Sequence, residues 1–246
     1  MSKERFVISV PDETLRDLRE RLGRTRLAPD FANANWEYGT KYEYLRELLD
    51  YWREQYDWRK HERAINSFAN YKTEIDGIPI HFIQEPGKGP KPVPLILSHG
   101  WPWTFWDFNK VIRPLSDPAA FGGDPADAFD VIVPSLPGYG FSTPLTKTGI
   151  NYWNTADLWV KLMRGELGYD RFAAQGGDWG ALITAQLGHK YAQHLIGVHL
   201  NLMAPLGFFG EDDVPKPEDW AADEKGWLER TQTFMDDGSG YMHEQR

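Results

Sequence analysis

The most informative stretch of this chain is Gln175-Gly176-Gly177-Asp178-Trp179-Gly180. It lies between a strand-like run at residues 171–174 and a helix-like run at residues 181–189. Read as Gly-x-Asp-x-Gly, it has a glycine on each side of the central aspartate. This pattern is typical of the strand-to-helix turn called a nucleophile elbow, which is too tight for side chains at the flanking positions. We expect Asp178 to stand at the carboxyl edge of a sheet.

An aspartate at the centre of such a turn indicates a particular chemistry. A carboxylate is ionised at neutral pH without help and can displace a leaving group at saturated carbon, whereas a hydroxyl nucleophile serves acyl transfer. The expected electrophile is an epoxide or a carbon–halogen bond. An aspartate before a helix can also simply cap it. The motif alone leaves that alternative open, so the rest of the chain must decide between them.

Composition narrows the class of protein. The 246 residues are 41% hydrophobic and 14% aromatic, which suits one large globular domain or one domain with an appendage. A net charge of -9 and a pI near 5.3 argue against a nucleic-acid partner. There is no cysteine and no apolar run of roughly 18 residues. We therefore expect a cytoplasmic protein with no membrane anchor, no cofactor and no metal.

Residues 1–70 predict a helical segment without a catalytic pattern. One amphipathic helix opens at Pro11 and ends at Gly23, a second covers residues 42–58, and a shorter third covers residues 59–68. We interpret this segment as a helical collar that packs against the residues that follow.

From residue 71 to residue 203 the periodicity becomes that of strands separated by helices. Asp76-Gly77 predicts a hairpin at a sheet edge, and the helices are expected at residues 104–115 and 154–167. The short apolar runs expected as buried strands are residues 94–98, 129–134, 171–174 and 196–203. This alternation predicts an α/β fold with a mainly parallel, doubly wound sheet, whose site lies at the carboxyl ends of the strands.

Three motifs fall at those strand ends, and together they resemble one family. They are His99-Gly100-Trp101-Pro102, Pro137-Gly138-Tyr139-Gly140-Phe141-Ser142 and the elbow itself. The combination resembles the epoxide hydrolases of the α/β-hydrolase fold, specifically the microsomal and juvenile-hormone branch. Residues 1–70 resemble the N-terminal region of that branch, and Ser239-Gly240-Tyr241-Met242-His243 resembles its lid. Residues 204–246 are accordingly expected to form a partial lid. Without the membrane anchor of animal members, the chain is similar to a soluble bacterial or fungal type.

The resemblance implies a two-step conversion of an epoxide to a vicinal diol. Asp178 would attack an epoxide carbon while Tyr241 gives a proton to the ring oxygen. Water would then hydrolyse the Asp178 ester, and the backbone N–H groups of Trp101 and Trp179 would stabilise the oxyanion. The side chains expected to line the substrate pocket are Trp101, Pro102, Trp103, Tyr139 and Trp179. For the aromatic ones, ordinary packing is the alternative.

The resemblance also implies relay residues that this sequence does not match. The family's acid and histidine follow the lid, so both, with a second lid tyrosine, are expected beyond Arg246. Asn201 occupies the other familiar position of the acid and does not ionise. None of the histidines considered matches the base of the family. We expect a structural role for His99, His243 belongs to the lid motif, and His189, His194 and His199 lie too soon after the elbow. We also expect an unpaired, apolar sheet edge.

Three explanations for the absent relay stay open. The chain is a piece of a longer or cleaved polypeptide, it is completed by a separate C-terminal fragment, or it is a truncated binding protein without catalysis. The first is favoured because residue 246 falls within a lid motif rather than at a domain boundary. The alternative enzyme is a haloalkane or haloacid dehalogenase, which shares the aspartate nucleophile but needs halide-binding donors. The helical N-terminal segment and the lid motif favour the epoxide.

Overall fold

A computed structural model describes residues 3–30, 32–202, 221–222, 226–238 and 240. The chain forms two compact units, Met1–Met203 and Ala204–Arg246. Within the second unit, helix α7 covers Gly226–Thr233 and a π-helical turn, η7, covers Phe234–Gly238. Tyr241 and His243, which the sequence places in a lid motif, lie outside the described residues.

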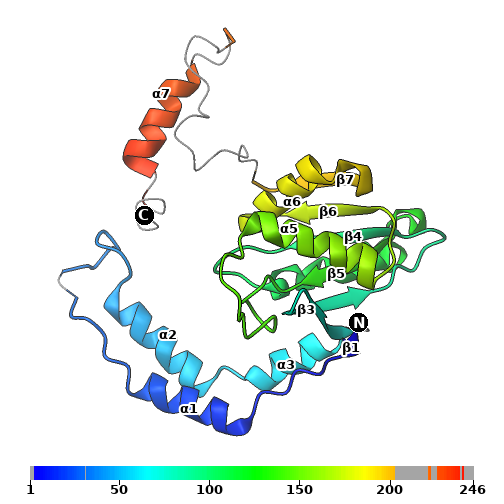
Figure 1. Cartoon of the computed structure of the whole chain (residues 1–246). Helices are drawn as coiled ribbons and strands as arrows, with labels where there is room; N and C mark the ends of the chain where they lie inside the picture. The colour runs from blue at the N-terminus through cyan, green and yellow to red at the C-terminus, as the bar shows by residue number, and fades with distance from the viewer. Residues whose placement is uncertain (1–2, 31, 203–220, 223–225, 239, 241–246) are drawn as a thin grey trace. The chain divides into compact units, whose positions relative to one another are not determined.

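The first unit is built on a seven-stranded sheet in the order β1-β2-β3-β5-β4-β6-β7 (Figure 1). Its strands are β1 Glu4–Arg5, β2 Asn70–Ile75, β3 Ile78–Glu85, β4 Val93–Ser98, β5 Phe129–Pro134, β6 Phe172–Gly176 and β7 Leu195–Leu200. Neighbours from β5 to β7 pair in parallel, and the pairs from β1 to β5 are antiparallel. Five of these seven described strands therefore run in one direction, which confirms the expected mainly parallel sheet.

Helices connect the strands. The α-helices of this unit are α1 Asp12–Gly23, α2 Tyr42–Glu54, α3 Trp58–Asn66, α4 Ile112–Ser116, α5 Tyr152–Val160 and α6 Trp179–Lys190. Shorter helical turns are η1 Phe105–Lys110, η2 Pro118–Phe121, η3 Pro125–Asp127, η4 Lys161–Glu166 and η5 Ala192–His194. Within the described residues, no helix has the length and apolar character needed to cross a membrane.

The hairpin predicted at residues 76–77 joins β2 to β3. Asp76 and Gly77 have φ values of 54° and 75°, and positive φ at both central residues is the geometry of a type I′ turn. Pro79 lies opposite Glu74, whereas pairing of β3 with β5 begins only at Phe82. The missing N–H of the proline therefore interrupts no ladder with β5.

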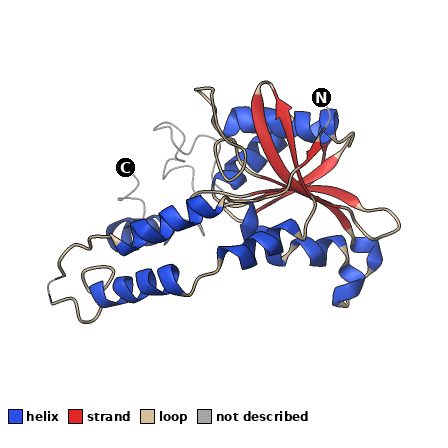
Figure 2. Cartoon of the chain, turned by 90° about the horizontal axis from the view of Figure 1, so that it is seen from below, coloured by secondary structure: helices blue, strands red, loops and turns tan. Residues whose placement is uncertain are grey.

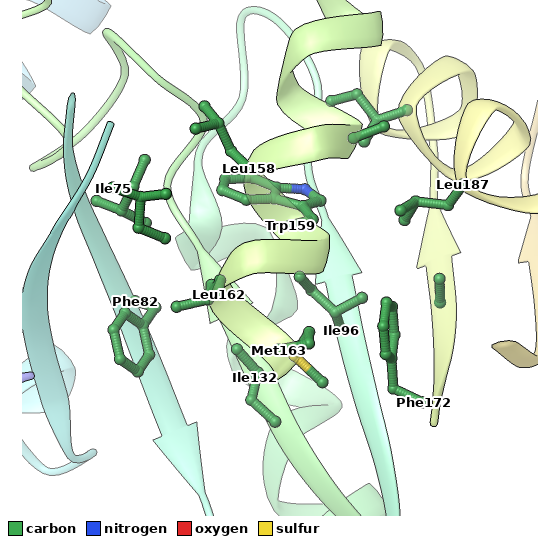
Figure 3. Close-up of a cluster of buried hydrophobic side chains, with 14 of the residues drawn as sticks. Ile75, Phe82, Ile96, Ile132, Leu158, Trp159, Leu162, Met163, Phe172 and Leu187 are labelled. Atoms are coloured by element: carbon green, nitrogen blue, oxygen red, sulfur yellow. The ribbon is translucent and has the colours of Figure 1, made fainter. Parts of the chain in front are cut away.

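The sheet buries apolar side chains on both faces, so alternate residues of one strand enter different cores. Ile96 of β4 and Ile132 of β5 pack under α5, η4 and α6, around Trp159 and Met163 (Figure 3). On the other face, neighbouring residues of β4 and β5 pack with side chains of α3, η1 and α4, including Phe105. Figure 2 shows helices on both sides of the sheet. This doubly wound arrangement holds the strand ends that carry the site.

Two predicted helices have different bounds in the structure. The helix expected over residues 104–115 is broken into η1 and α4, because Pro114 has no N–H to donate to the carbonyl of Lys110. The helix expected from residue 154 begins at Tyr152. Asn151 caps it, accepting hydrogen bonds from the N–H groups of Trp153 at 3.0 Å and Asn154 at 3.2 Å.

The N-terminal helices differ in how they are held. α1 packs against α2, and neither helix has a buried residue among those described. α3 joins the sheet core through Ile65. The buried Glu62 accepts hydrogen bonds from Val10 N–H at 2.7 Å and Arg59 at 2.6 Å, so it fixes the segment before α1 on α3. The expected collar therefore contacts the core through α3.

The far edge of the sheet is apolar. In the described residues β7 pairs only with β6, and Ile196 and Val198 are 51% and 48% exposed. This matches the expectation of an unpaired, apolar edge.

Candidate active site

Asp178 stands at the junction of β6 and α6 in a strained backbone conformation. Its φ and ψ are 53° and -128°, a combination that a residue with a side chain rarely adopts. The residue precedes α6, yet its side chain makes no cap hydrogen bond. The simple helix-cap alternative is therefore wrong for the carboxylate, which is free of the helix it precedes and lies at the positive end of that helix.

Glycines around the elbow are required by close backbone approaches. A Cβ on Gly176 would lie 1.9 Å from the carbonyl oxygen of Gly180, and one on Gly180 would lie 2.0 Å from the carbonyl oxygen of Ser98. A Cβ on Gly100 would lie 2.3 Å from Asp178 Oδ1. The elbow thus packs directly on the end of β4, and this packing explains the glycines in both motifs.

The backbone N–H of Trp101 donates a hydrogen bond to Asp178 Oδ1 at 2.9 Å. The loop after β4 therefore presents a donor to one oxygen of a half-buried carboxylate. A backbone donor in this position is the kind of group that stabilises an oxyanion. The equivalent role expected for the N–H of Trp179 stays a prediction.

His99 is a structural residue, in agreement with the sequence interpretation. Its Nδ1–H donates to the carbonyl of Gly100 at 2.8 Å, and its Nε2 accepts from Leu136 N–H at 3.0 Å. Burial lowers the pKa of His99 to about 4, so the ring is neutral near pH 7. It ties the Trp101 loop to the loop that follows β5.

His81, on β3, is a second buried histidine and was not identified from the sequence. The side-chain nitrogen of Asn70 donates to two carbonyls, so its Oδ1 is the atom that accepts a hydrogen bond from His81 Nε2–H at 3.1 Å. His81 Nδ1 then accepts from Ser135 Oγ at 2.9 Å, and His81 N–H donates to Ser142 Oγ at 2.9 Å. Burial lowers the pKa of His81 to about 3. This network fixes both ends of residues 135–142.

The loop at residues 135–142 carries Tyr139 beside the nucleophile. The Tyr139 ring meets His99 edge-on, with centroids 5.7 Å apart. Burial raises the pKa of Tyr139, and the negative charge of Asp178 raises it further. Tyr139 is therefore protonated near pH 7 and lies within electrostatic reach of the carboxylate.

A cavity of about 250 Å³ lies beside the elbow. Tyr139 and Trp179, both expected to line a pocket, are part of its wall. Trp101, Pro102 and Trp103 do not line it, and Trp101 and Trp103 are 41% and 51% exposed; their place in a substrate pocket stays a prediction. Sequence reasoning missed the other walls, which include Leu136, Asn151, Tyr152, Thr155 and Ile183.

Asn201 supports the elbow from the end of β7. Its N–H donates to the carbonyl of Gly176 at 3.0 Å, and its side-chain oxygen accepts from Gln175 Nε2 at 3.0 Å. It supplies no charge there. Over the described part of the chain, no group of three or more histidine, aspartate or glutamate side chains is arranged to hold a metal ion.

Comparison with known families agrees with this geometry. The family described as "alpha/beta hydrolase fold" matches residues 93–237, and the one described as "Epoxide hydrolase N terminus" matches residues 3–108. The chain belongs to the α/β-hydrolase fold family, and its residues 3–108 are similar to the N-terminal domain of epoxide hydrolases. The expected fold class is therefore confirmed.

Individual relatives are similar over much of this chain. A relative from Stigmatella aurantiaca is 43% identical over 237 residues, which are 96% of this chain and 52% of the relative. Epoxide hydrolase 1 of Oryctolagus cuniculus is 42% identical over 80% of this chain and 44% of its own length. The solved structure of Aspergillus niger epoxide hydrolase has a TM-score of 0.79 and 32% identity, over 99% of this chain and 63% of that one. The chain spans about half the length of these two curated relatives.

Proposed function

We propose that this chain provides the nucleophile of an epoxide hydrolase, which converts an epoxide to a vicinal diol through an ester on Asp178. The observation that carries this proposal is the 2.9 Å hydrogen bond from Trp101 N–H to Asp178 Oδ1. The Asp178 side chain makes no cap hydrogen bond to the helix that follows it. The N-terminal domain match and the names of the relatives support the same reaction.

The hydrogen bond assigns different roles to the two carboxylate oxygens. Oδ1 is held by Trp101, so Oδ2 is the oxygen that attacks the epoxide carbon. The carbon–oxygen bond of the ring breaks, and the ring oxygen takes a proton from a phenol, because an alkoxide is a poor leaving group near neutral pH. We propose Tyr241 as that phenol. Oδ1 becomes the carbonyl oxygen of the ester.

Hydrolysis of the ester uses the same donor. Water attacks the Asp178 carbonyl carbon, and negative charge develops on Oδ1, which already accepts from Trp101 N–H. The bond from that carbon to Oδ2 then breaks, and the diol leaves with Oδ2. One water proton goes to that diol oxygen and the other restores the phenol, so Asp178 is a carboxylate again. We propose Trp179 N–H as the second donor. Loss of one such donor typically costs about 3 kcal/mol in the transition state. His81 and His99 are neutral with both ring nitrogens hydrogen-bonded, so we assign the base for this step to neither of them.

Three segments of the chain have different roles in this reaction. Residues 1–70 form the helical N-terminal part, residues 71–203 hold the nucleophile and the backbone donors, and residues 204–246 supply the proton donor. Epoxide and water are the proposed small-molecule partners, and the cytoplasm is the proposed compartment.

The experiment compares an epoxide with a haloalkane. Styrene oxide should give diol, or a protein whose mass has increased by that of the whole epoxide, while 1-bromobutane should release no bromide. Asp178→Asn, which keeps the shape and an acceptor for Trp101, should give neither product. Bromide release without reaction of the epoxide would instead support the dehalogenase.

A further inference from the structure

The peptide group that joins Gly100 to Trp101 lies directly against the nucleophile. Its N–H is the Trp101 donor, 2.9 Å from Asp178 Oδ1. A Cβ on Gly100 would lie 2.3 Å from the same oxygen, so no atom fits between this backbone and the carboxylate. The peptide bond is trans, which places its C=O and its N–H on opposite sides of the bond. A group that holds the carbonyl therefore also sets the direction of the N–H.

The ring of His99 holds that carbonyl. Its Nδ1 lies 2.8 Å from the oxygen of Gly100, and its Nε2 lies 3.0 Å from the backbone nitrogen of Leu136. A carbonyl oxygen can only accept a hydrogen bond and a backbone N–H can only donate one, so the ring carries its proton on Nδ1. A doubly protonated ring could not accept from Leu136 N–H. The two partners therefore fix one tautomer of the neutral imidazole.

These groups form one continuous chain of hydrogen bonds. Leu136 N–H donates to His99, His99 donates to the carbonyl of Gly100, and the N–H of Trp101 donates to Asp178. All three donors point along the chain toward the carboxylate, so each bond polarises the next and strengthens it by about 10–30%. His99 is 2% exposed, and water therefore does not replace its ring as the donor to the carbonyl.

We propose that His99 is a positioning residue for the oxyanion of the reaction. It orients and polarises the peptide group between Gly100 and Trp101, so that the N–H is directed at Asp178 Oδ1 when negative charge develops there. His99 does not touch the substrate and transfers no proton. This role rests on the proposed chemistry of Asp178. It requires the N–H donor at Nδ1, whereas a role in holding two loops together requires only a buried ring that binds both.

Two substitutions separate the two nitrogens of the ring. The side-chain nitrogen of asparagine lies as many bonds from the backbone as Nδ1, so His99→Asn keeps the donor to Gly100 and loses the acceptor for Leu136. The side-chain oxygen of glutamine matches Nε2, so His99→Gln keeps the acceptor and loses the donor. Each variant leaves one buried backbone group without its partner, and we expect similar losses of stability.

His81→Gln is the matched control. His81 is also a buried, neutral histidine, and it fastens the same loop at residues 135–142 through Ser135 Oγ. The hydrogen bonds of its ring go to Ser135 and Asn70 and not to the peptide group beside Asp178. A general loosening of the loop should therefore appear in this variant as well. Thermal unfolding shows whether each of the three variants is folded.

Cleavage of the Asp178 ester by hydroxylamine measures the stabilisation of the oxyanion without the base that hydrolysis needs. The ester is formed with styrene oxide, and the excess epoxide is removed. The nitrogen of hydroxylamine attacks the carbonyl carbon, which places negative charge on Oδ1. The bond from that carbon to Oδ2 then breaks, and the diol leaves with Oδ2 and a proton from the nitrogen. A hydroxamate remains at Asp178.

Mass spectrometry follows the loss of the epoxide mass with time. His99→Gln should slow the cleavage at least about tenfold, because the N–H of Trp101 is no longer directed at Oδ1. His99→Asn and His81→Gln should stay within about threefold of the parent chain. In concentrated guanidinium all four chains should react at the same rate, since the donor is absent from unfolded protein.

A spectroscopic measurement follows the same peptide group and needs no epoxide. The sequence has two Gly-Trp pairs, at residues 100–101 and 226–227. With ¹³C at glycine carbonyls and ¹⁵N at tryptophan, a spectrum that links each carbonyl to the next nitrogen contains two signals, and Gly226→Ala identifies the second. The amide proton of Trp101 should move to lower frequency in His99→Gln and keep the parent position in His99→Asn.

The outcomes separate this proposal from the proposed function. Equal cleavage rates in His99→Asn and His99→Gln, or equal movement of the Trp101 signal, would show that the donor at Nδ1 has no special role. If both variants unfold, the spectrum of ¹⁵N-labelled histidine in the parent chain decides: the proposal requires a neutral ring with its proton on Nδ1, and a folded chain without one contradicts it. If styrene oxide does not attach to Asp178, the proposed function is wrong, and the Trp101 signal still tests how the peptide group is held.

Discussion

The carboxyl edge of the sheet and the helices α1 and α2 belong to the same unit, but packing restricts their residues to very different degrees. At the edge, Gly176 and Gly180 lie so close to backbone atoms that a single methyl group would not fit. In α1 and α2 no described residue is buried, and Tyr51 and Trp52 are 50% and 42% exposed. Packing therefore fixes residue identity at the site, whereas apolar periodicity alone specifies the helices.

The largest effect is expected for Gly180→Ala. Its Cβ would lie 2.0 Å from the carbonyl oxygen of Ser98, which is backbone and cannot move aside, so we expect a loss of about 3 kcal/mol or more. Gly165 has no atom within 4 Å of its Cβ position, and Gly165→Ala should be neutral or slightly stabilising. Guanidinium unfolding measures both. Equal losses at the two glycines would contradict the comparison.

The buried histidines predict a pH-dependent stability. The pKa values of His81 and His99 are lowered to about 3 and about 4 in the folded chain, so the unfolded chain binds their protons first as the pH falls below 6.5. Between pH 6.5 and pH 5, each histidine should lower the free energy of unfolding by up to about 1.4 kcal/mol per pH unit.

The measurement is the free energy of unfolding against pH in this window, where most carboxylates stay ionised in both states. His81→Gln should remove about half of the slope that the two histidines produce. A parent chain with the same stability at pH 6.5 and pH 5 would show that the two rings are not buried in the neutral form.

A smaller loss is expected for Ser142→Ala. Ser142 Oγ accepts from His81 N–H at 2.9 Å and donates to the carbonyl of Ser135 at 2.7 Å, and all three residues are buried. Removing the hydroxyl leaves both groups without that partner, at a cost of about 1 to 3 kcal/mol. Ser67→Ala, at an exposed helix end, should cost less than about 0.5 kcal/mol because water replaces the hydroxyl. Urea unfolding distinguishes them, and a larger loss at Ser67 would refute the role of the network.

The smallest effect is expected on α2. Leu48 is 44% exposed, so Leu48→Ser should change the stability of the sheet core by no more than about 0.5 kcal/mol. Leu97→Ser of β4, a residue that is 2% exposed, is the matched control and should unfold the chain or cost several kcal/mol. A similar cost at Leu48 would mean that α2 contributes to that core.

The elbow and the hairpin could be predicted from the sequence because each motif has few alternative structures. Gly-x-Asp-x-Gly leaves one tight turn, and Asp76-Gly77 leaves one hairpin. The prediction of one continuous helix over residues 104–115 was wrong. It followed from the apolar pattern and did not take account of Pro114, which interrupts the helix. The start of α5 was missed although Asn151 is a good cap, since Asn154 in the first turn is a weaker signal than glutamate or glutamine.

Most of the cavity and the His81 network were not predictable in this way. Tyr152 and Ile183 line the cavity only because α5 and α6 cross the sheet beside each other, a tertiary contact with no local signature. His81 sits in a strand between apolar neighbours, and its partners come from two distant places in the sequence, Asn70 from the start of β2 and Ser135 and Ser142 from the loop after β5. Short motifs record local geometry, whereas these features arise from long-range packing.

The most direct test of the account is to find where an epoxide becomes attached to this chain. Trypsin cuts after Arg171 and Lys190, and the peptide between them contains Asp178 as its only acidic side chain. After brief treatment with styrene oxide and an acid quench, this peptide should gain the mass of one whole epoxide, and the Asp178→Asn peptide should not. A modification on any other peptide, or one that persists in the Asn variant, would contradict Asp178 as the nucleophile.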